Sequence, residues 1–439
     1  MNLFKISKPD KIFVGTLTII SVIATILVYA LQFNAPPIRS DGIGYYSYLP
    51  SIFIHKDISM KSLMDERAQK YNAPTPDSWN GINRIKNGNY LDKYTMGEAV
   101  LMLPFFIAAH VLSIVFHQTP NGFTLFYQLL IGFAGLFYMI LGLYVVKKIL
   151  EKYFSNKVIY ISLTILTFGT NLFHYGTYDS IFSHTYSFFL FAAFLYFLPI
   201  WFENISNKRN AVILGTLVGL IALVRPTNII LPLIFILLWN LNLKKSTERI
   251  LLFWSHKLSI IISIFVSILV FLPQLIYWRI ITGEFFSFSY KGEYFDFAHP
   301  QIGNVLFSIQ RGLLFWSPLI VIGIIGLFLQ RKKLKPWLLP TAAFFVLNLF
   351  IISSWWAWSY GGGFGHRAFI ESYAVLSIPF TALMAKIISM RNKFLRISLF
   401  ILISLLVFLS IYVMINYWNR NLKPDGTTLE QFLSIFPAK

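Results

Sequence analysis

The sequence contains no cysteine and few charged residues, and each shortage excludes a class of protein. Without cysteine, the fold uses neither a disulfide nor a thiolate metal site. Charged residues make up only 13% of the 439 residues, whereas hydrophobic residues make up 56%. The mean hydropathy is +0.64, and a soluble globular domain cannot bury that much apolar surface. The composition therefore predicts a single transmembrane domain over residues 1–439.

Apolar runs recur along the whole chain at about the length that a hydrocarbon core of about 30 Å requires of a helix. We predict an all-α polytopic membrane fold with about eleven spans. The predicted spans are 12–33, 123–146, 158–173, 184–202, 211–224, 228–241, 258–278, 313–329, 337–354, 368–388 and 397–417. The first run is too long for the apolar part of a signal peptide, and no small-residue cleavage site follows it. We expect it to be retained as the first span.

The positive charges predict the orientation in the membrane. A net charge of +19 would suggest nucleic acid binding in a soluble protein, but here the lysines and arginines lie in short loops between apolar runs. Membrane lipids with anionic headgroups are the expected partner, and nucleic acid is not. Eighteen of these cations lie in one set of alternate loops and five in the other. The positive-inside rule places the first set and the N-terminus in the cytoplasm.

One apolar run, 99–116, would reverse every later loop if it crossed the membrane. The charge pattern needs an even number of crossings before the cytoplasmic loop that starts at Lys147, and the spans 12–33 and 123–146 already supply two. We therefore expect the run 99–116 to lie in the outer interface or to re-enter. An ordinary span with the N-terminus outside is the alternative that the sequence leaves open.

Fourteen of the eighteen acids fall on the outer side in this topology, and none lies at the midpoint of a span. A proton- or sodium-coupled transporter usually keeps an acid there. We expect the chemistry at the outer face instead. Its three longest segments are the first extracytoplasmic loop 34–96 with interfacial helices, the aromatic loop 279–311 and the C-terminal tail 418–439.

Two outer segments carry isolated aspartates. Asp41 follows closely on the first span and precedes an aromatic stretch with Tyr45 and Tyr46, and Asp179 lies between two histidines, His174 and His184. Each aspartate could simply cap the helix that follows it. Two histidines and one aspartate resemble a metal set, but spacings of five residues fit no standard site, so no metal is predicted.

Glycines and arginines elsewhere on the outer face suggest an anion site. Four glycines occupy five positions from Gly361 to Gly365, and His366 and Arg367 follow them. Glycine amides can cradle an anion, and an arginine at a helix start completes a phosphate site. Arg225 lies at an outer turn, where it could also extend to lipid headgroups. From Gly283 to Phe297, aromatic residues alternate with a few charged ones. This pattern predicts either a loop that covers a ligand or an interfacial anchor.

Several of these residues carry a family resemblance. Asp41 with Tyr45 and Tyr46, the proline of the interfacial run, the pair Tyr178-Asp179 and the turn 223–227 resemble the glycosyltransferase C superfamily. The closest likeness is to bacterial relatives of the protein O-mannosyltransferases and of the lipid A aminoarabinose transferase. The segments 311–318 and 355–369 resemble bacterial membrane proteins usually grouped there.

The resemblance implies an enzyme of the bacterial plasma (inner) membrane with its site on the extracytoplasmic side. The family transfers a sugar, with inversion, from a polyprenyl-phosphate donor to an acceptor. Its first-loop acid acts as the base, and that position matches Asp41. Many members have a second acid directly after it, where this chain has Gly42. Asp179 matches the family's second outer acid by location.

These patterns together predict a single displacement at the anomeric carbon. Asp41 takes the proton of an acceptor hydroxyl on a lipid, glycan or protein, and Asp179 is the second catalytic acid, orienting the acceptor or the neighbours of Asp41. Other residues are predicted to bind the donor without a cofactor: Arg225, Arg367, His366, Tyr45, Tyr46, His184, Gly362 and Gly363. A flippase or transporter of polyprenyl-linked sugars and a non-catalytic scaffold remain open alternatives.

Overall fold

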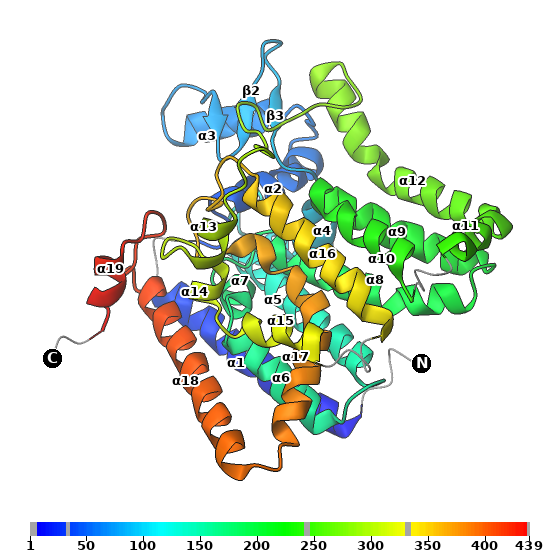
Figure 1. The fold of residues 1–439 in the computed structure, drawn as a ribbon. Coiled ribbons are helices and arrows are strands. Elements are labelled where there is room, and N and C mark those ends of the chain that lie inside the picture. The colour runs from blue at the N-terminus through cyan, green and yellow to red at the C-terminus, as the bar shows by residue number, and fades with distance from the viewer. Residues whose placement is uncertain (1–6, 32–35, 241–245, 330–334, 437–439) are drawn as a thin grey trace.

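The computed structural model describes residues 7–31, 36–240, 246–329 and 335–436, and helices make up most of it (Figure 1). The predicted spans 12–33 and 228–241 and the tail 418–439 each end outside the described residues. Seven of the described helices are long and apolar enough to cross a membrane: α1 (Lys8–Leu31), α4 (Gly97–Val115), α5 (Leu125–Leu150), α8 (His184–Glu203), α12 (Lys257–Thr282), α16 (Lys335–Ser353) and α18 (Lys393–Trp418). The predicted all-α membrane fold is confirmed, whereas the number of spans stays a prediction.

Shorter helices complete the bundle and cap the end that we predict to face outward. Those in or beside the bundle are α6 (Asn156–Phe168), α9 (Lys208–Val224), α10 (Ile230–Leu238), α11 (Ser246–Ser255), α15 (Ile320–Leu329) and α17 (Ser372–Ile388). Those in the outer segments are α2 (Asp41–Leu49), η1 (Pro50–Ile54), α3 (Lys61–Lys70), α7 (Leu172–Thr177), η2 (Pro226–Ile229), α13 (Ile302–Phe307), α14 (Leu313–Trp316), η4 (Arg367–Phe369) and α19 (Leu429–Ser434).

Two predicted spans are interrupted within their apolar runs. The run 158–173 ends as a helix at Phe168, and α7 begins after a break that contains Gly169. The run 313–329 is divided at Pro318, which has no N–H to donate and disfavours helical backbone in the residue before it. Each break ends an apolar helix early.

Buried charges join α1 to α5 at the end of the bundle that we predict to be cytoplasmic. The Asp10 carboxylate of α1 forms an ion pair with Lys147 near the end of α5, and the Tyr160 hydroxyl donates a hydrogen bond of 2.6 Å to it. The start of α1 therefore lies beside the end of α5. The two helices run antiparallel, as two successive crossings require.

The helix α4 packs against other segments near both of its ends. At its start, Gly97 packs against the backbone of Leu223 and Val224, at the end of α9. Beyond its other end, the Gly122 carbonyl accepts a hydrogen bond of 2.5 Å from Tyr46 of α2. By length and composition α4 could span a membrane. Between its ends, α4 lies beside the first half of α5, because the Tyr138 hydroxyl donates to the Leu101 carbonyl at 2.9 Å and His110 bonds to the Tyr127 hydroxyl at 2.6 Å. Whether α4 spans the membrane or lies in the interface stays a prediction.

A small antiparallel sheet, which the sequence analysis did not predict, stands in the first outer loop. Its strands are β1 (Ser78–Trp79), β2 (Ile82–Arg84) and β3 (Tyr90–Asp92), in that order. Asn80 and Gly81 both have positive φ and connect β1 to β2, as a two-residue hairpin turn requires. Strands of two or three residues are too short to leave a periodic pattern in the sequence. The sheet matters because it delivers Asp92 and Lys93 to the space beneath and beside α2.

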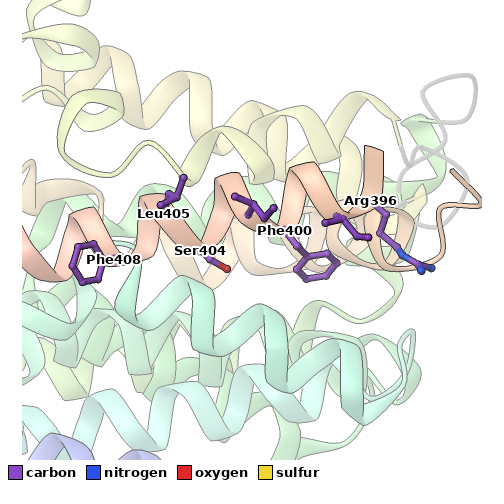
Figure 2. Close-up of a pocket in the computed structure, with 7 residues that line it drawn as sticks. Arg396, Phe400, Ser404, Leu405 and Phe408 are labelled. Carbon is purple, nitrogen blue, oxygen red and sulfur yellow. The ribbon is translucent and has the colours of Figure 1, made fainter. Parts of the chain in front are cut away.

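The helix α18 shows how apolar the outside of the bundle is. A groove of about 590 Å³ runs along it, with apolar side chains such as Phe400 and Leu405 and with Arg396 at one end (Figure 2). Phe408 on this face is 67% exposed. Side chains of this kind match a surface that contacts lipid rather than water.

Candidate active site

The helix α2 presents Asp41 and Tyr45 on one face, because residues four apart on a helix point the same way. Asp41 is the first residue of α2, directly after Ser40, whose backbone has φ 49° and ψ −138°. The Tyr45 ring lies 4.3 Å from the ring of Tyr94, which follows the small sheet. This face of α2 forms one wall of the candidate site.

Asp41 is paired with Arg367, although the two residues come from opposite halves of the chain. The Asp41 Oδ2 atom lies 2.8 Å from Arg367 Nη2, and the Asp41 side chain is 27% exposed. Burial by itself raises the pKa of Asp41, but the Arg367 charge, the Tyr94 hydroxyl and Lys93 together hold that pKa below its ordinary value. The carboxylate is therefore ionised at neutral pH.

Arg225 lies in a second cluster with His184, and a residue that we had not predicted, Glu371, joins them. Glu371 Oε1 lies 3.8 Å from Arg225 Nε, and Glu371 Oε2 lies 3.2 Å from His184 Nδ1. Arg225 Nη1 also donates to Ser183, whose hydroxyl donates to Tyr45 at 3.2 Å. The position of Glu371, one helical turn after Arg367 at an outer helix start, is the sequence signal that could have identified it.

The aromatic loop 279–311 lies against the first outer loop beside this cluster. Glu293 forms an ion pair of 2.7 Å with Lys93, and the Ser289 hydroxyl donates to the Lys93 carbonyl at 2.7 Å. Tyr290 of this loop packs against Tyr94 and Trp355. The loop therefore borders the site as one of the two predicted roles requires. Its outward rings, Phe286 among them, stay exposed.

Asp179 contacts neither Asp41 nor Arg367 through any described ion pair or hydrogen bond. Its Oδ1 atom pairs with Arg39 at 3.0 Å and its Oδ2 atom lies 2.9 Å from His174 Nε2. The indole of Trp418, the last residue of α18, donates to His174 Nδ1 at 2.9 Å. Asp179 therefore anchors Arg39, two residues before Asp41, and its catalytic role stays a prediction.

The strained backbone of Ser40 is the reason that an anchor at Arg39 matters. Its positive φ is a conformation that favours glycine and costs about 1–3 kcal/mol in other residues. On its N-terminal side, the Ile38 amide donates to Gln128 at 2.9 Å and Arg39 is held by Asp179. These contacts hold the strained turn that directs Asp41 into the site.

We expect Asp179→Asn to lower the turnover of sugar transfer about tenfold, with donor affinity within about twofold, because 1–2 kcal/mol of lost anchoring corresponds to a factor of about 5–30. The added substitution Ser40→Gly should restore part of the turnover, because glycine adopts the Ser40 backbone conformation without strain. Steady-state kinetics on the single and double variants measure both effects. Loss of donor affinity in the single variant, or no restoration in the double variant, contradicts the anchoring role.

Two predicted binding residues do not line the site. Tyr46 is rotated by about 100° from Tyr45 around α2, and its buried ring packs against Phe106 and Phe123. Its hydroxyl donates to the Gly122 carbonyl, so Tyr46 faces away from the side of α2 that carries Asp41 and Tyr45, and its binding of substrate stays a prediction. His366 is fully buried, and its Nε2 atom lies 3.1 Å from the Trp358 carbonyl. It braces the segment before Arg367 rather than facing Asp41.

The glycine segment also differs from the prediction. The Gly363 amide donates to the Pro424 carbonyl at 2.8 Å, so it is not free to bind a phosphate. Gly362 is exposed and packs on the same carbonyl. The space around Gly363 is taken by the Tyr175 hydroxyl, because a Cβ atom there would lie 2.5 Å from it. Gly363 thus allows close packing between Tyr175 and Arg367, and the binding of substrate by Gly362 and Gly363 stays a prediction.

Asp92 lies beneath α2 with no exposed surface, and its Oδ2 atom has no hydrogen-bond partner among the described residues. Burial raises the pKa of Asp92 to about 8, despite the Tyr94 amide and the Lys93 charge. Between about pH 4 and about pH 8, the folded state keeps the Asp92 proton that the unfolded state releases. The stability of the fold therefore falls as the pH rises through this range. This carboxyl is an internal support of α2.

We expect Asp92→Asn to raise the thermal unfolding midpoint at pH 7.5 and to leave it unchanged near pH 4. The amide is neutral at both pH values, and its oxygen can still accept the Tyr94 N–H bond of 2.9 Å. Unfolding followed by intrinsic fluorescence in detergent measures the midpoints. An equal change at both pH values would show that packing, not ionisation, sets the effect.

Among the described residues, no three histidine or acidic side chains converge as a metal site. The expectation that the reaction uses no metal or other cofactor stays a prediction. The described residues bring together two arginines, Arg225 beside Glu371 and Arg367 beside Asp41. Tyr45 lies between these two clusters. Such a site can bind a phosphate and can accept a proton.

The fold, in contrast to the sequence, resembles solved structures. No protein-family model matches the chain, and no curated protein matches its sequence. The archaeal oligosaccharyltransferase AglB from Archaeoglobus fulgidus, solved in complex with an inhibitory peptide and a dolichol-phosphate, gives a TM-score of 0.54 at 12% identity, covering 98% of this chain and 58% of that one. The apo form of the Archaeoglobus fulgidus oligosaccharyltransferase gives 0.51 at 14% identity, with 96% and 57% covered.

This chain therefore spans less than two thirds of the length of either neighbour. At such low identity the likeness concerns the fold alone. It confirms the predicted architecture: over nearly its whole length, the chain has the same fold as part of these two oligosaccharyltransferase structures.

Proposed function

We propose that the chain is an inverting membrane glycosyltransferase that moves a sugar from a polyprenyl-phosphate donor to a hydroxyl acceptor. The observation that carries the proposal is the ion pair between Asp41 and Arg367 at the outer end of the bundle. It holds a base and a phosphate-binding cation within 2.8 Å of each other. The neighbour solved with a dolichol-phosphate supports a lipid phosphate as the ligand of this fold.

The reaction follows from the charges. The donor phosphate replaces Asp41 as the ion-pair partner of Arg367, and Arg225 is the second cation that binds the phosphate. The Asp41 carboxylate is then free to face the acceptor. The acceptor oxygen then attacks the anomeric carbon, its proton passes to Asp41, and the bond from that carbon to the phosphate oxygen breaks. The phosphate leaves with the electron pair, so it needs cations rather than an acid.

Tyr45 and His184 lie where they can contact the sugar or the phosphate, beside Arg225. The acceptor can be a lipid, a glycan or a protein, because the same base serves any hydroxyl. The positive-inside pattern supports a site on the extracytoplasmic side of a bacterial plasma membrane.

The test uses purified protein in detergent, farnesyl phosphates that carry radiolabelled sugars, and a bacterial envelope extract as the acceptor source. Transfer of label to a new species, with release of farnesyl phosphate, supports the proposal. A flippase needs a sealed bilayer and makes no covalent product. If label never leaves the farnesyl phosphate while sealed vesicles containing the protein move it across the membrane, the flippase is the correct function.

A further inference from the structure

A cavity of about 330 Å³ lies between the first outer loop and the start of α5. Its volume falls within the usual range of ligand pockets, about 300–1,000 Å³. Apolar side chains from several segments line it, among them Ile38 before α2, Ile43 of α2, Leu63 of α3 and Phe123 before α5. None of the residues that we predict to bind the sugar donor lines this cavity.

The cavity is separate from the candidate active site, although α2 borders both. Ile43 lies two residues after Asp41, so the two side chains point about 200° apart around the helix. Ile38 and Ile43, which line the cavity, lie on either side of the turn at Ser40 along the chain. A ligand in the cavity therefore contacts the residues that flank this turn without occupying the donor site.

The same cavity carries positive charge. Arg67 and Lys70, three residues apart on α3, both line it. The Arg67 guanidinium lies over the Trp79 ring, 4.1 Å from the ring centroid. Stacking of this kind holds the planar group and leaves its N–H edge for a phosphate. Glu66 is the acid of the lining, and its Oε2 atom lies 3.0 Å from His55 Nε2, so the two cations determine the sign of the charge.

The position of the cavity indicates a lipid as its ligand. Pro36, which lines it, lies five residues after the end of α1, and Gln128 lies in the first turn of α5. Both helices are predicted spans, and these are the ends that we predict to face outward. The cavity is thus expected at the level of the lipid headgroups, where cationic side chains attract anionic lipids.

We propose that this cavity binds an anionic phospholipid of the outer leaflet. The lipid phosphate contacts Arg67 and Lys70, and the first part of an acyl chain packs against Ile38 and Phe123. The required chemistry is a phosphate joined to an apolar chain. A free phosphate lacks the apolar part, and a zwitterionic lipid carries a positive charge that the two cations repel. The inference goes beyond the proposed function, because such a lipid binds here whether or not the chain transfers sugar.

The test counts the lipids bound to the purified full chain in a neutral detergent by native mass spectrometry. The probes are phosphatidylglycerol, phosphatidylcholine and glycerol 3-phosphate, which share a phosphate but differ in net charge or in apolar chains. The test variants are Arg67→Gln and Lys70→Gln. Lys61→Gln is the matched control, since Lys61 is an exposed lysine of the same helix that does not line the cavity.

We expect the wild-type protein to keep at least one more phosphatidylglycerol than phosphatidylcholine. Arg67→Gln should weaken this binding about tenfold or more, because hydrogen bonds to charged groups are strong. Lys70→Gln should weaken it about two- to fivefold, since Lys70 is exposed. Lys61→Gln should leave it unchanged, and glycerol 3-phosphate at the concentration of the lipid should not displace it.

Four results would overturn the inference: equal binding of the two lipids, unchanged binding in Arg67→Gln, an effect of Lys61→Gln as large as that of Lys70→Gln, or displacement by glycerol 3-phosphate. Thermal unfolding without lipid checks the fold of each variant, and if Arg67→Gln does not fold, the comparison of Lys70→Gln with Lys61→Gln decides. Absence of sugar transfer from a labelled donor is a different result, because it removes the proposed function and leaves this lipid site in place.

Discussion

Asp41→Asn is expected to slow sugar transfer by about 10²–10⁴-fold, the usual contribution of a general base, while donor binding becomes as tight as in the wild type or tighter. The two effects have opposite directions for one reason. In the ligand-free protein, Arg367 is bound to Asp41, so the donor phosphate must displace that carboxylate. The amide cannot accept the acceptor's proton, and it also no longer competes as an anion for Arg367.

Turnover with radiolabelled donor and titration with farnesyl phosphate measure the two effects separately. Asp77→Asn is the matched control, since Asp77 lies in the same outer loop with its side chain 86% exposed and pairs with Arg84. It should change neither quantity. Near-normal transfer by a folded Asp41→Asn protein would remove Asp41 as the base, whatever happens to donor binding.

Arg367→Ala is expected to weaken donor binding about 10–100-fold, because hydrogen bonds to charged groups are worth about 1.5–3 kcal/mol. The donor affinity of Arg367→Lys should lie between those of Arg367→Ala and the wild type, since lysine keeps the charge but not the planar pair of donors. The substitution Arg367→Ala also affects the proposed base, Asp41. Arg367 holds the pKa of Asp41 down, so its loss raises that pKa and moves the acidic limb of the rate profile to higher pH.

The control for this experiment is Arg84→Ala, in the first outer loop, whose side chain is half exposed and pairs with Asp77. It should leave donor affinity unchanged. Titration with farnesyl phosphate and a pH profile of turnover are the two measurements. Unchanged donor affinity in a folded Arg367→Ala protein would place the phosphate elsewhere, with Arg225 as the next candidate.

The sequence predicted the fold class, and it pointed to Asp41 and Arg367 as candidate site residues without indicating that they pair. Hydropathy identifies apolar runs, and it is insensitive to a break inside one, so the interruptions at Gly169 and Pro318 were missed. Asp41 and Arg367 were each predicted from local context. Their ion pair depends on how the first outer loop sits on the bundle, and no local pattern encodes that.

Single residues such as Tyr46 and Gly363 have surroundings that differ from the predicted ones, and the differences have physical causes as well. Tyr46 was predicted with Tyr45 because the two are adjacent, yet adjacent residues on a helix point about 100° apart. Gly363 was predicted as an anion donor, and the fold gives its amide to the C-terminal tail. Glu371 was counted only as an outer charge. Its importance appears when burial and partners are known, since it is buried beside Arg225.

The hydrogen bond from Trp418 to His174 has a consequence for where protons can go. An indole N–H only donates, so His174 Nδ1 must accept, and the single ring proton of the neutral imidazole stays on Nε2, directed at Asp179. Burial lowers the pKa of His174 and so favours this neutral form, while Asp179 keeps a lowered pKa and remains an anion. The tautomer set from the end of α18 thus directs a donated proton at Asp179 Oδ2, while Arg39 contacts Oδ1.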